Sequence, residues 1–220
     1  MNKALEQLYR GKWNNLIENS KELRTAYPLL IKVNEDYVNA DIRVMIVGQE
    51  TDGWIGELQK CEKSIAEAQE EYFKYFYKSK NKNRRPFWNR KNFRYFKEEL
   101  VKRWPNKKVG FVWNNVHKIG KISRGKPTPR IIGLERRYFD VFGSELDILA
   151  PNIIIFASGD RCIPVKHLKV KPVNKDPVSK VHLLDFPDIF AVRTYHPNAQ
   201  IKGGKKHFKK QVLNLVCEDT

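Results

Sequence analysis

Four short apolar runs, separated by helical patterns, constrain the fold of this chain more than any other feature. Each run is rich in β-branched or aromatic residues and is followed by polar, glycine or proline residues, which is typical of buried strands. The runs cover residues 43–47, 109–113, 152–157 and 189–194. Helical patterns cover residues 3–23, 64–77, 89–103, 130–149 and 205–216. Because helices alternate with single strands, we expect a three-layer α/β/α sandwich around a central four-stranded parallel sheet.

The length of 220 residues suits one domain with a full core. We expect a single domain over residues 1–220, with an N-terminal helical segment at 1–40 and an insertion at 55–87 that holds a helix and a basic loop. No apolar run approaches the roughly 18 residues of a membrane span, and the N-terminus lacks the apolar core of a signal peptide. We therefore expect a cytoplasmic monomer that does not bind membranes.

The charge of the chain points to a polyanionic partner. It has 42 Lys and Arg residues against 25 Asp and Glu residues, a formal net charge of +17. Such an excess favours DNA or another nucleic acid over an anionic membrane, and a small substrate does not need it. The loop at residues 78–85 is either a solvated connector or a phosphate-contacting loop. Its candidate contacts are Lys80, Lys82, Arg84 and Arg85.

Cysteine and histidine usage predicts no metal and no cofactor. The three cysteines lie far apart, so they form neither a disulfide framework nor a zinc or iron–sulfur site. The five histidines are equally dispersed. No lysine falls within the polar segments that end the four runs, so an amine nucleophile is not expected either.

Polar residues follow the first run, where a parallel strand ends. A tight turn accounts for Gly53 and Asp52, but it does not account for Gln49 and Glu50 directly at the strand end. Ligands of open α/β sheets bind at this edge. A carboxylate there, either Glu50 or Asp52, could deprotonate a water or stabilise a developing cation.

Polar residues that could bind a ligand or take part in catalysis also follow two further runs. Asn114 and Asn115 follow the second run, and an amide offers both a donor and an acceptor to a base edge. Their side chains point in opposite directions in extended backbone, so the choice between them stays open. His196 ends the fourth run, where a buried structural histidine is the usual interpretation. One aromatic residue could stack on a base, and the candidates are Phe76, Tyr77 and Phe87.

Taken together, these segments resemble the motifs of the uracil-DNA glycosylase superfamily. Residues 48–52 lie over its Gly-Gln-Asp-Pro-Tyr motif, and residues 112–114 resemble its Leu-Leu-Asn motif. Residues 149–159 resemble its Leu-x-Pro run, and residues 196–200 resemble its His-Pro-Ser-Pro-Leu motif. Residues 86–93 look like the helix start between the first two motifs in the single-strand-selective branch.

The resemblance implies a monofunctional glycosylase that flips a nucleotide out of DNA, hydrolyses its N-glycosidic bond and leaves an abasic site. Glu50 would orient the water, Gln49 would bind the base through its backbone, and Asn114 would read the base edge. His196 would stabilise the charge on the departing base. Gln200 or Ile201 would hold the space of the flipped nucleotide. The expected DNA contacts of this region are Asn198, Gln200, Ile201, Lys202, Lys205 and Lys206.

Departures from the family pattern concern the choice of base. Glu50 is one methylene longer than the family's aspartate, and Thr51 replaces a proline. Asp52 stands where the family has a tyrosine that blocks a 5-methyl group. The pattern predicts excision of uracil or of a modified, bulky 5-substituted pyrimidine, in DNA repair or in defence against modified foreign DNA. Two alternatives are a non-catalytic DNA-binding protein of the same fold and a nucleoside hydrolase, against which the charge argues.

Overall fold

The computed structural model describes residues 1–79, 88, 93–159, 168–171, 176–196, 199 and 205–218. The chain forms two compact units that interleave along the sequence. Unit 1 comprises residues 1–33, 49–78 and 114–149, and unit 2 comprises residues 34–48, 79–113 and 150–220. The chain therefore passes from unit 2 to unit 1 directly after Gly48 and again after Trp113.

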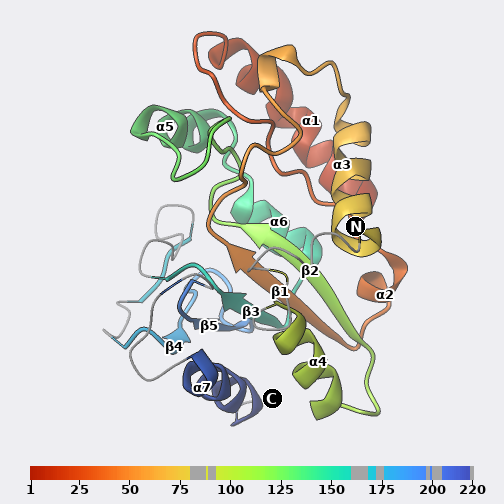
Figure 1. Cartoon of the computed structure of the whole chain (residues 1–220). Coiled ribbons are helices and arrows are strands. Elements are labelled where there is room, and N and C mark those ends of the chain that lie inside the picture. Colours follow the sequence, from red (N-terminus) through yellow and green to blue (C-terminus); the bar gives the residue numbers. More distant parts are fainter. Residues whose placement is uncertain are drawn as a thin grey trace. The chain divides into compact units, whose positions relative to one another are not determined.

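A five-stranded sheet forms the centre of unit 2 (Figure 1). Its strands are β1 (Ile42–Gly48), β2 (Val109–Asn115), β3 (Ile153–Phe156), β4 (Ser179–Val181) and β5 (Phe190–Arg193), in the order β2-β1-β3-β5-β4. The last two residues of β2 already belong to unit 1. The α/β class and all four predicted strands are confirmed. The purely parallel, four-stranded sheet was wrong, because β4 adds a fifth strand that runs antiparallel to β5.

The strand directions follow from the backbone pairing. β1 and β3 pair in parallel, and so do β3 and β5. β2 starts beside the start of β1, since Asp41 and Ile42 both donate to the carbonyl oxygen of Lys108. Val44 to Val47 are all buried, which explains why β1 is a continuous apolar run and does not alternate.

Three helices belong to unit 2: α2 (Glu35–Val38), α4 (Phe93–Arg103) and α7 (Lys205–Glu218). α7 packs on β5 and β4 and also on α4, where the Lys209 ammonium lies 4.9 Å from the ring centre of Tyr95. α2 approaches β2 closely at Gly110, where a Cβ would lie 2.7 Å from the Cα of Tyr37. Only glycine permits that approach.

Unit 1 is mainly helical. Its helices are α1 (Asn2–Asn19), η1 (Leu58–Lys60), α3 (Ile65–Phe73), the π-helical turn η2 (Lys74–Lys78), α5 (Pro129–Tyr138) and α6 (Phe142–Leu149). A capping box between Ser64 and Glu67 starts α3 where the sequence predicted. The single helix predicted over residues 130–149 was wrong, because the chain breaks at Phe139 into two helices. No helix in the described ranges is long and apolar enough to cross a membrane.

Candidate functional site

Within unit 1, the segment that follows β1 is held against the segment that follows β2. The carbonyl oxygen of Gln49 accepts a hydrogen bond of 2.9 Å from the backbone N–H of His117. Gly120 packs on Thr51 so closely that a Cβ there would lie 2.4 Å from the Thr51 carbonyl oxygen. The two strand-end segments that the sequence singled out are thus neighbours in unit 1.

The chain then makes a turn with unusual backbone angles. Gly53, Ile55 and Gly56 all have positive φ angles, of 65°, 59° and 120°. Such a φ is a genuine outlier for a β-branched residue, and it costs of order 1–3 kcal/mol. The Tyr27 N–H donates to the carbonyl oxygen of Gly56 at 2.9 Å and anchors the turn. Backbone strain of this kind clusters at functional sites.

The two candidate carboxylates have different surroundings. Asp52 is exposed, and one of its carboxylate oxygens lies 3.6 Å from the Arg124 guanidinium. Glu50 is half-buried at the end of β1. The structure therefore commits Asp52 to a surface ion pair, and Glu50 is the more enclosed of the two.

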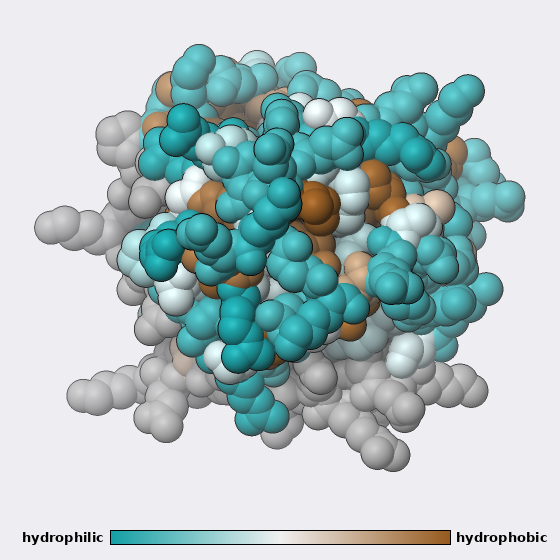
Figure 2. Space-filling view, turned by 90° about the horizontal axis from the view of Figure 1, so that it is seen from above, coloured by the Kyte–Doolittle hydropathy of each residue, from teal (hydrophilic) through white to brown (hydrophobic). Residues whose placement is uncertain are grey.

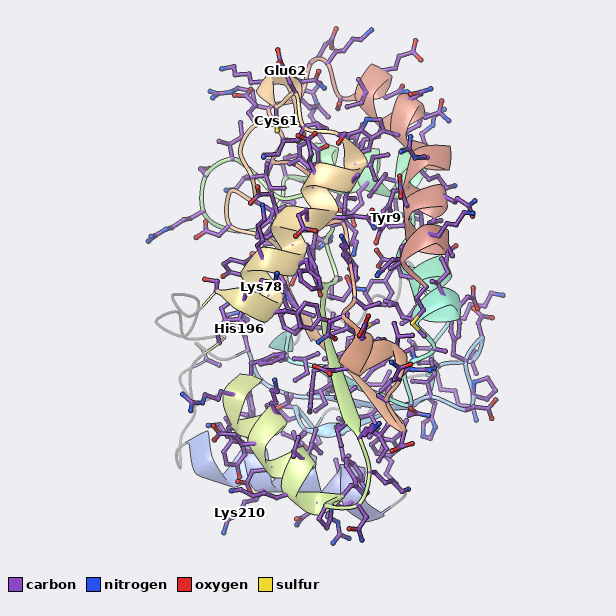
Figure 3. The ribbon with its side chains drawn as sticks, turned by 90° about the vertical axis from the view of Figure 1, so that its right-hand side faces the viewer. Tyr9, Cys61, Glu62, Lys78, His196 and Lys210 are labelled. Carbon is purple, nitrogen blue, oxygen red and sulfur yellow. The ribbon has the colours of Figure 1, made fainter. Side chains whose placement is uncertain are left out.

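Asn114 belongs to a buried polar cluster of unit 1, together with Tyr9, Lys118 and Glu145. Its amide nitrogen donates to Glu145 at 2.9 Å, and its amide oxygen accepts from the Lys118 ammonium at 2.6 Å. Lys118 also pairs with Glu145 at 2.7 Å, and the Tyr9 hydroxyl donates to the same carboxylate at 2.7 Å. Figure 3 shows Tyr9 reaching inwards from α1. The amide that the sequence assigned to base reading is thus held in an internal network.

Burial and charge shift two pKa values in this cluster. Burial lowers the pKa of the Lys118 ammonium, and the neighbouring Glu145 carboxylate counteracts that shift. Burial also raises the pKa of the Tyr9 hydroxyl well above its usual value, and Glu145 adds to that rise. The side chains of Lys118 and Glu145 are only 1% and 0% exposed, so this is a buried ion pair.

His117 and Glu135 form a polar pair close to these segments that the sequence analysis did not single out. The Glu135 carboxylate lies 4.0 Å from Nδ1 of His117 and accepts from the Ile119 N–H at 2.9 Å. Asn115, two positions before His117 in the sequence, is buried. The position of His117 after the second strand run was the one available signal, but Glu135 lies on a different helix and no spacing pointed to it.

Two of the three predicted stacking aromatics, Phe76 and Tyr77, lie on the π-helical turn η2. Phe76 is only 5% exposed and is a core residue, whereas Tyr77 is half-buried and contacts the Phe76 ring edge-on at 4.6 Å. Phe73, one turn earlier, has the ammonium groups of Lys32 and Lys78 at 5.6 and 5.2 Å from its ring centre. Lys78 marks the end of this turn in Figure 3. Tyr77 is the more accessible of the described candidates, and Phe87 lies outside the described residues.

In unit 2, His196 lies where β3 and β5 end. The Gly159 N–H donates to the carbonyl oxygen of Thr194 at 3.0 Å, and a Cβ on Gly159 would lie 3.4 Å from the backbone nitrogen of His196. Tyr195 packs edge-on against Phe208 of α7 at 5.5 Å. These contacts hold the half-buried His196 at the carboxyl edge of the sheet.

Two buried hydroxyls close to these strand ends have no hydrogen-bond partner among the described residues. They are Thr51 Oγ1 in unit 1 and Thr194 Oγ1 in unit 2, whose residues are 4% and 1% exposed.

The remaining predicted contacts lie outside the described residues. They are Lys80, Lys82, Arg84, Arg85, Asn198, Gln200, Ile201 and Lys202. α7 begins at Lys205, but the side chains of Lys205 and Lys206 are likewise not described. Among the described residues, no group of three His, Cys, Asp or Glu side chains could hold a metal ion.

We compared the chain with family models, curated proteins and solved structures. None matches.

Proposed function

We propose that this chain is a monofunctional DNA glycosylase that excises uracil or a modified pyrimidine, with a fold related to the uracil-DNA glycosylase superfamily. The net charge of +17 supports a nucleic-acid partner. The polar residues that follow the strands, Gln49, Glu50 and His196, support the excision of a base.

The observation that carries the proposal is the strand order of unit 2. From β1 the chain passes to β2 on one side of β1 and then crosses to β3 on its other side. The direction in which strands are added therefore reverses between β1 and β3. Ligands of open α/β sheets bind at the carboxyl ends of the strands at such a switch point. Gln49 and Glu50 directly follow β1 along the chain, and His196 packs on Gly159, which lies just beyond β3.

The chemistry assigned to these residues follows from the reaction. Hydrolysis breaks the bond between the sugar C1′ and the base nitrogen, and a water oxygen forms the new bond to C1′. Positive charge develops on the sugar, so a carboxylate stabilises it and takes the proton of the water. We assign this role to Glu50, because it directly follows β1 and is more enclosed than the exposed Asp52. His196 would stabilise the negative charge on the departing base.

The segment after Glu50 also bears on the choice of base. The resembling superfamily has a tyrosine where this chain has Asp52, and that tyrosine excludes a 5-methyl group. An exposed carboxylate in its place favours a larger pyrimidine with polar groups at the 5-position. The proposal therefore includes hydroxymethylated or glycosylated cytosine as substrates.

Base release from labelled oligonucleotides tests the proposal. Duplexes and single strands carrying uracil, a thymine mismatch, or hydroxymethylated or glycosylated cytosine would be incubated with the protein and cleaved with hot alkali. We expect abasic product from at least one substrate, and at least a hundredfold slower release for Glu50→Gln and His196→Ala. Matched controls are Glu22→Gln and His182→Ala, whose residues are exposed. No abasic product from any substrate would refute the enzyme.

The engagement of Asn114 favours one other function, a non-catalytic DNA-binding protein of the same fold. Its amide is held by Glu145 and Lys118, so it is occupied without a base. This function predicts tight DNA binding with no abasic product, and binding that Glu50→Gln leaves unchanged. The same set of oligonucleotides, used in a binding assay and a release assay, separates the two functions.

A further inference from the structure

A groove of about 650 Å³ lies in unit 1, beside the segment that follows β1, since a Cβ on Gly53 would lie 2.9 Å from the carbonyl oxygen of its lining residue Ile122. We call its apolar lining residues the floor and its basic and hydroxylated lining residues the rim. The lining residues are Leu23, Arg24, Lys121, Ile122, Ser123, Thr128, Arg130 and Ile131. Figure 2 views the molecule from the end at which α1 and α5 lie, and hydrophobic side chains are visible there between mainly hydrophilic ones.

The loop that lines the groove is rich in cations, two of which are paired with carboxylates from elsewhere in unit 1, Arg124 with Asp52 and Lys118 with Glu145. Residues 118–134 contain five Lys or Arg side chains and no Asp or Glu. Arg24 pairs with Glu57 at 3.3 Å, and Lys60 shares that carboxylate. By contrast, neither Lys121 nor Arg130 forms an ion pair with a carboxylate of the described residues. Two cations of the rim are therefore not neutralised within the part of the chain that the structure describes.

The groove also contains the start of α5. Thr128 is the N-cap residue of this helix, and its hydroxyl accepts from the Ile131 N–H at 3.3 Å. The first turn of α5 holds no acidic residue. Helix N-termini carry partial positive charge that acidic side chains usually offset, so here the helix adds to the field of Lys121 and Arg130.

The backbone beneath the groove is well anchored. Lys121 pairs with Thr25 in an antiparallel bridge, and the Ala26 N–H donates to the carbonyl oxygen of Gly120 at 2.9 Å. Gly125 has a φ of 97°, and a Cβ there would lie 3.6 Å from the Lys121 ammonium. The loop thus folds back over Lys121, and the rim cations project from a scaffold that is already formed.

We propose that this groove binds phosphates of a DNA backbone, with Lys121 and Arg130 as the principal contacts. A groove of this volume accommodates a ligand of nucleotide size. Its apolar floor suits the sugar, while the cations and the α5 N-terminus suit the phosphates. The inference depends on DNA as the partner in the proposed function, but it does not depend on base excision.

Fluorescence anisotropy with a labelled 20-mer duplex tests the groove. The variant is Lys121→Ala/Arg130→Ala, and the control is Lys3→Ala/Lys12→Ala, which removes the same charge from exposed positions of α1. Each lost phosphate contact should lower the slope of log K against log salt by about 0.9. We expect the groove variant to lose at least tenfold in affinity and nearly two in slope. For the control variant, the loss of affinity and the loss of slope should each be no more than about a third of the loss expected for the groove variant.

Two further measurements make the outcomes decisive. Thermal unfolding should show the same Tm for the groove variant and the wild type, because both side chains are on the rim. Inorganic phosphate and a free mononucleotide should compete with DNA only at millimolar concentration. Equal affinity and slope for the groove variant and the control would overturn the proposal. So would tight binding of a free mononucleotide that leaves DNA binding unaffected.

The groove and the glycosylase activity can fail separately. If no substrate releases a base while the groove variant still weakens DNA binding, the enzyme is wrong and the groove is supported. If bases are released and the groove variant has normal affinity, normal slope and normal release rates at subsaturating DNA, the groove is wrong and the enzyme is supported.

Discussion

The buried pair of Lys118 and Glu145 gives the sharpest prediction, through Glu145→Gln. Glutamine keeps the shape of Glu145 but removes the counter-charge of an ammonium that is only 1% exposed. It also converts one acceptor into a donor, which then faces either the Asn114 amide or the Lys118 and Tyr9 donors. Removing one partner of a buried ion pair costs about 3–5 kcal/mol. The ratio of folded to unfolded protein should therefore fall by about 2 to 3.5 powers of ten.

The loss should shrink as the pH rises. Burial already lowers the pKa of Lys118 in the native protein, and without Glu145 that pKa falls further. Between this lowered value and the unfolded value of roughly 10.4, the unfolded state binds more protons, so stability rises with pH. The variant should regain part of its stability as the pH rises toward the unfolded value of roughly 10.4.

Urea unfolding followed by circular dichroism measures both effects. The control is Glu6→Gln, which breaks an exposed pair with Arg10 on α1 and should cost no more than about 0.5 kcal/mol. Should Glu145→Gln not fold, Lys118→Met/Glu145→Leu should recover part of the stability, because it leaves no buried charge but takes the partners of the Asn114 amide and the Tyr9 hydroxyl away. A loss no larger than that of the control, or a loss that does not change with pH, would refute the reasoning.

Three other predictions concern close packing, helix propensity and alkaline pH. Gly120→Ala should cost about 1–3 kcal/mol in urea unfolding, because its Cβ collides with the Thr51 carbonyl oxygen; an unchanged midpoint would contradict the contact. Gly133→Ala, in the exposed middle of α5 with open space around it, should stabilise by about 0.5–1 kcal/mol in the same assay. Burial raises the pKa of Tyr9 and Tyr37, so unfolded tyrosines lose protons first and the free energy of unfolding should fall above about pH 10. Stability that is level between pH 9 and pH 11 would show that these hydroxyls titrate normally.

Sequence patterns predicted the strands well because the parallel strands are buried along their length. For that reason β1 appears in the sequence as one apolar run, and the polar residues Gln49 and Glu50 that follow it were predicted together with the strand. β4 was missed because three residues, one of them a lysine, carry no detectable period. The break between α5 and α6 was missed because Phe139 and Val141 are buried core residues that continue the apolar pattern through it.

The buried cluster around Glu145 could not be predicted in the same way. Tyr9 and Glu145 are separated by 136 positions and touch only because α1 and α6 pack together. Nothing local distinguishes Lys118 from the surface lysines nearby, and only burial reveals its role. The groove was missed for a related reason, since Arg24 comes from a different part of the chain than Lys121 and Arg130.

The interleaving of the two units has a consequence for synthesis on the ribosome. Unit 1 is complete once residue 149 has emerged, whereas β1 still lacks its neighbour β3, which begins at Ile153, and β5 begins only at Phe190. The earliest apolar strand of the sheet therefore gains β2 on one side first, and its neighbour on the other side is made more than a hundred residues later. Such long-range pairing is slow and leaves apolar strands exposed in the nascent chain. A chaperone that shelters β1 should be needed more by this protein than the stability of its finished fold would indicate.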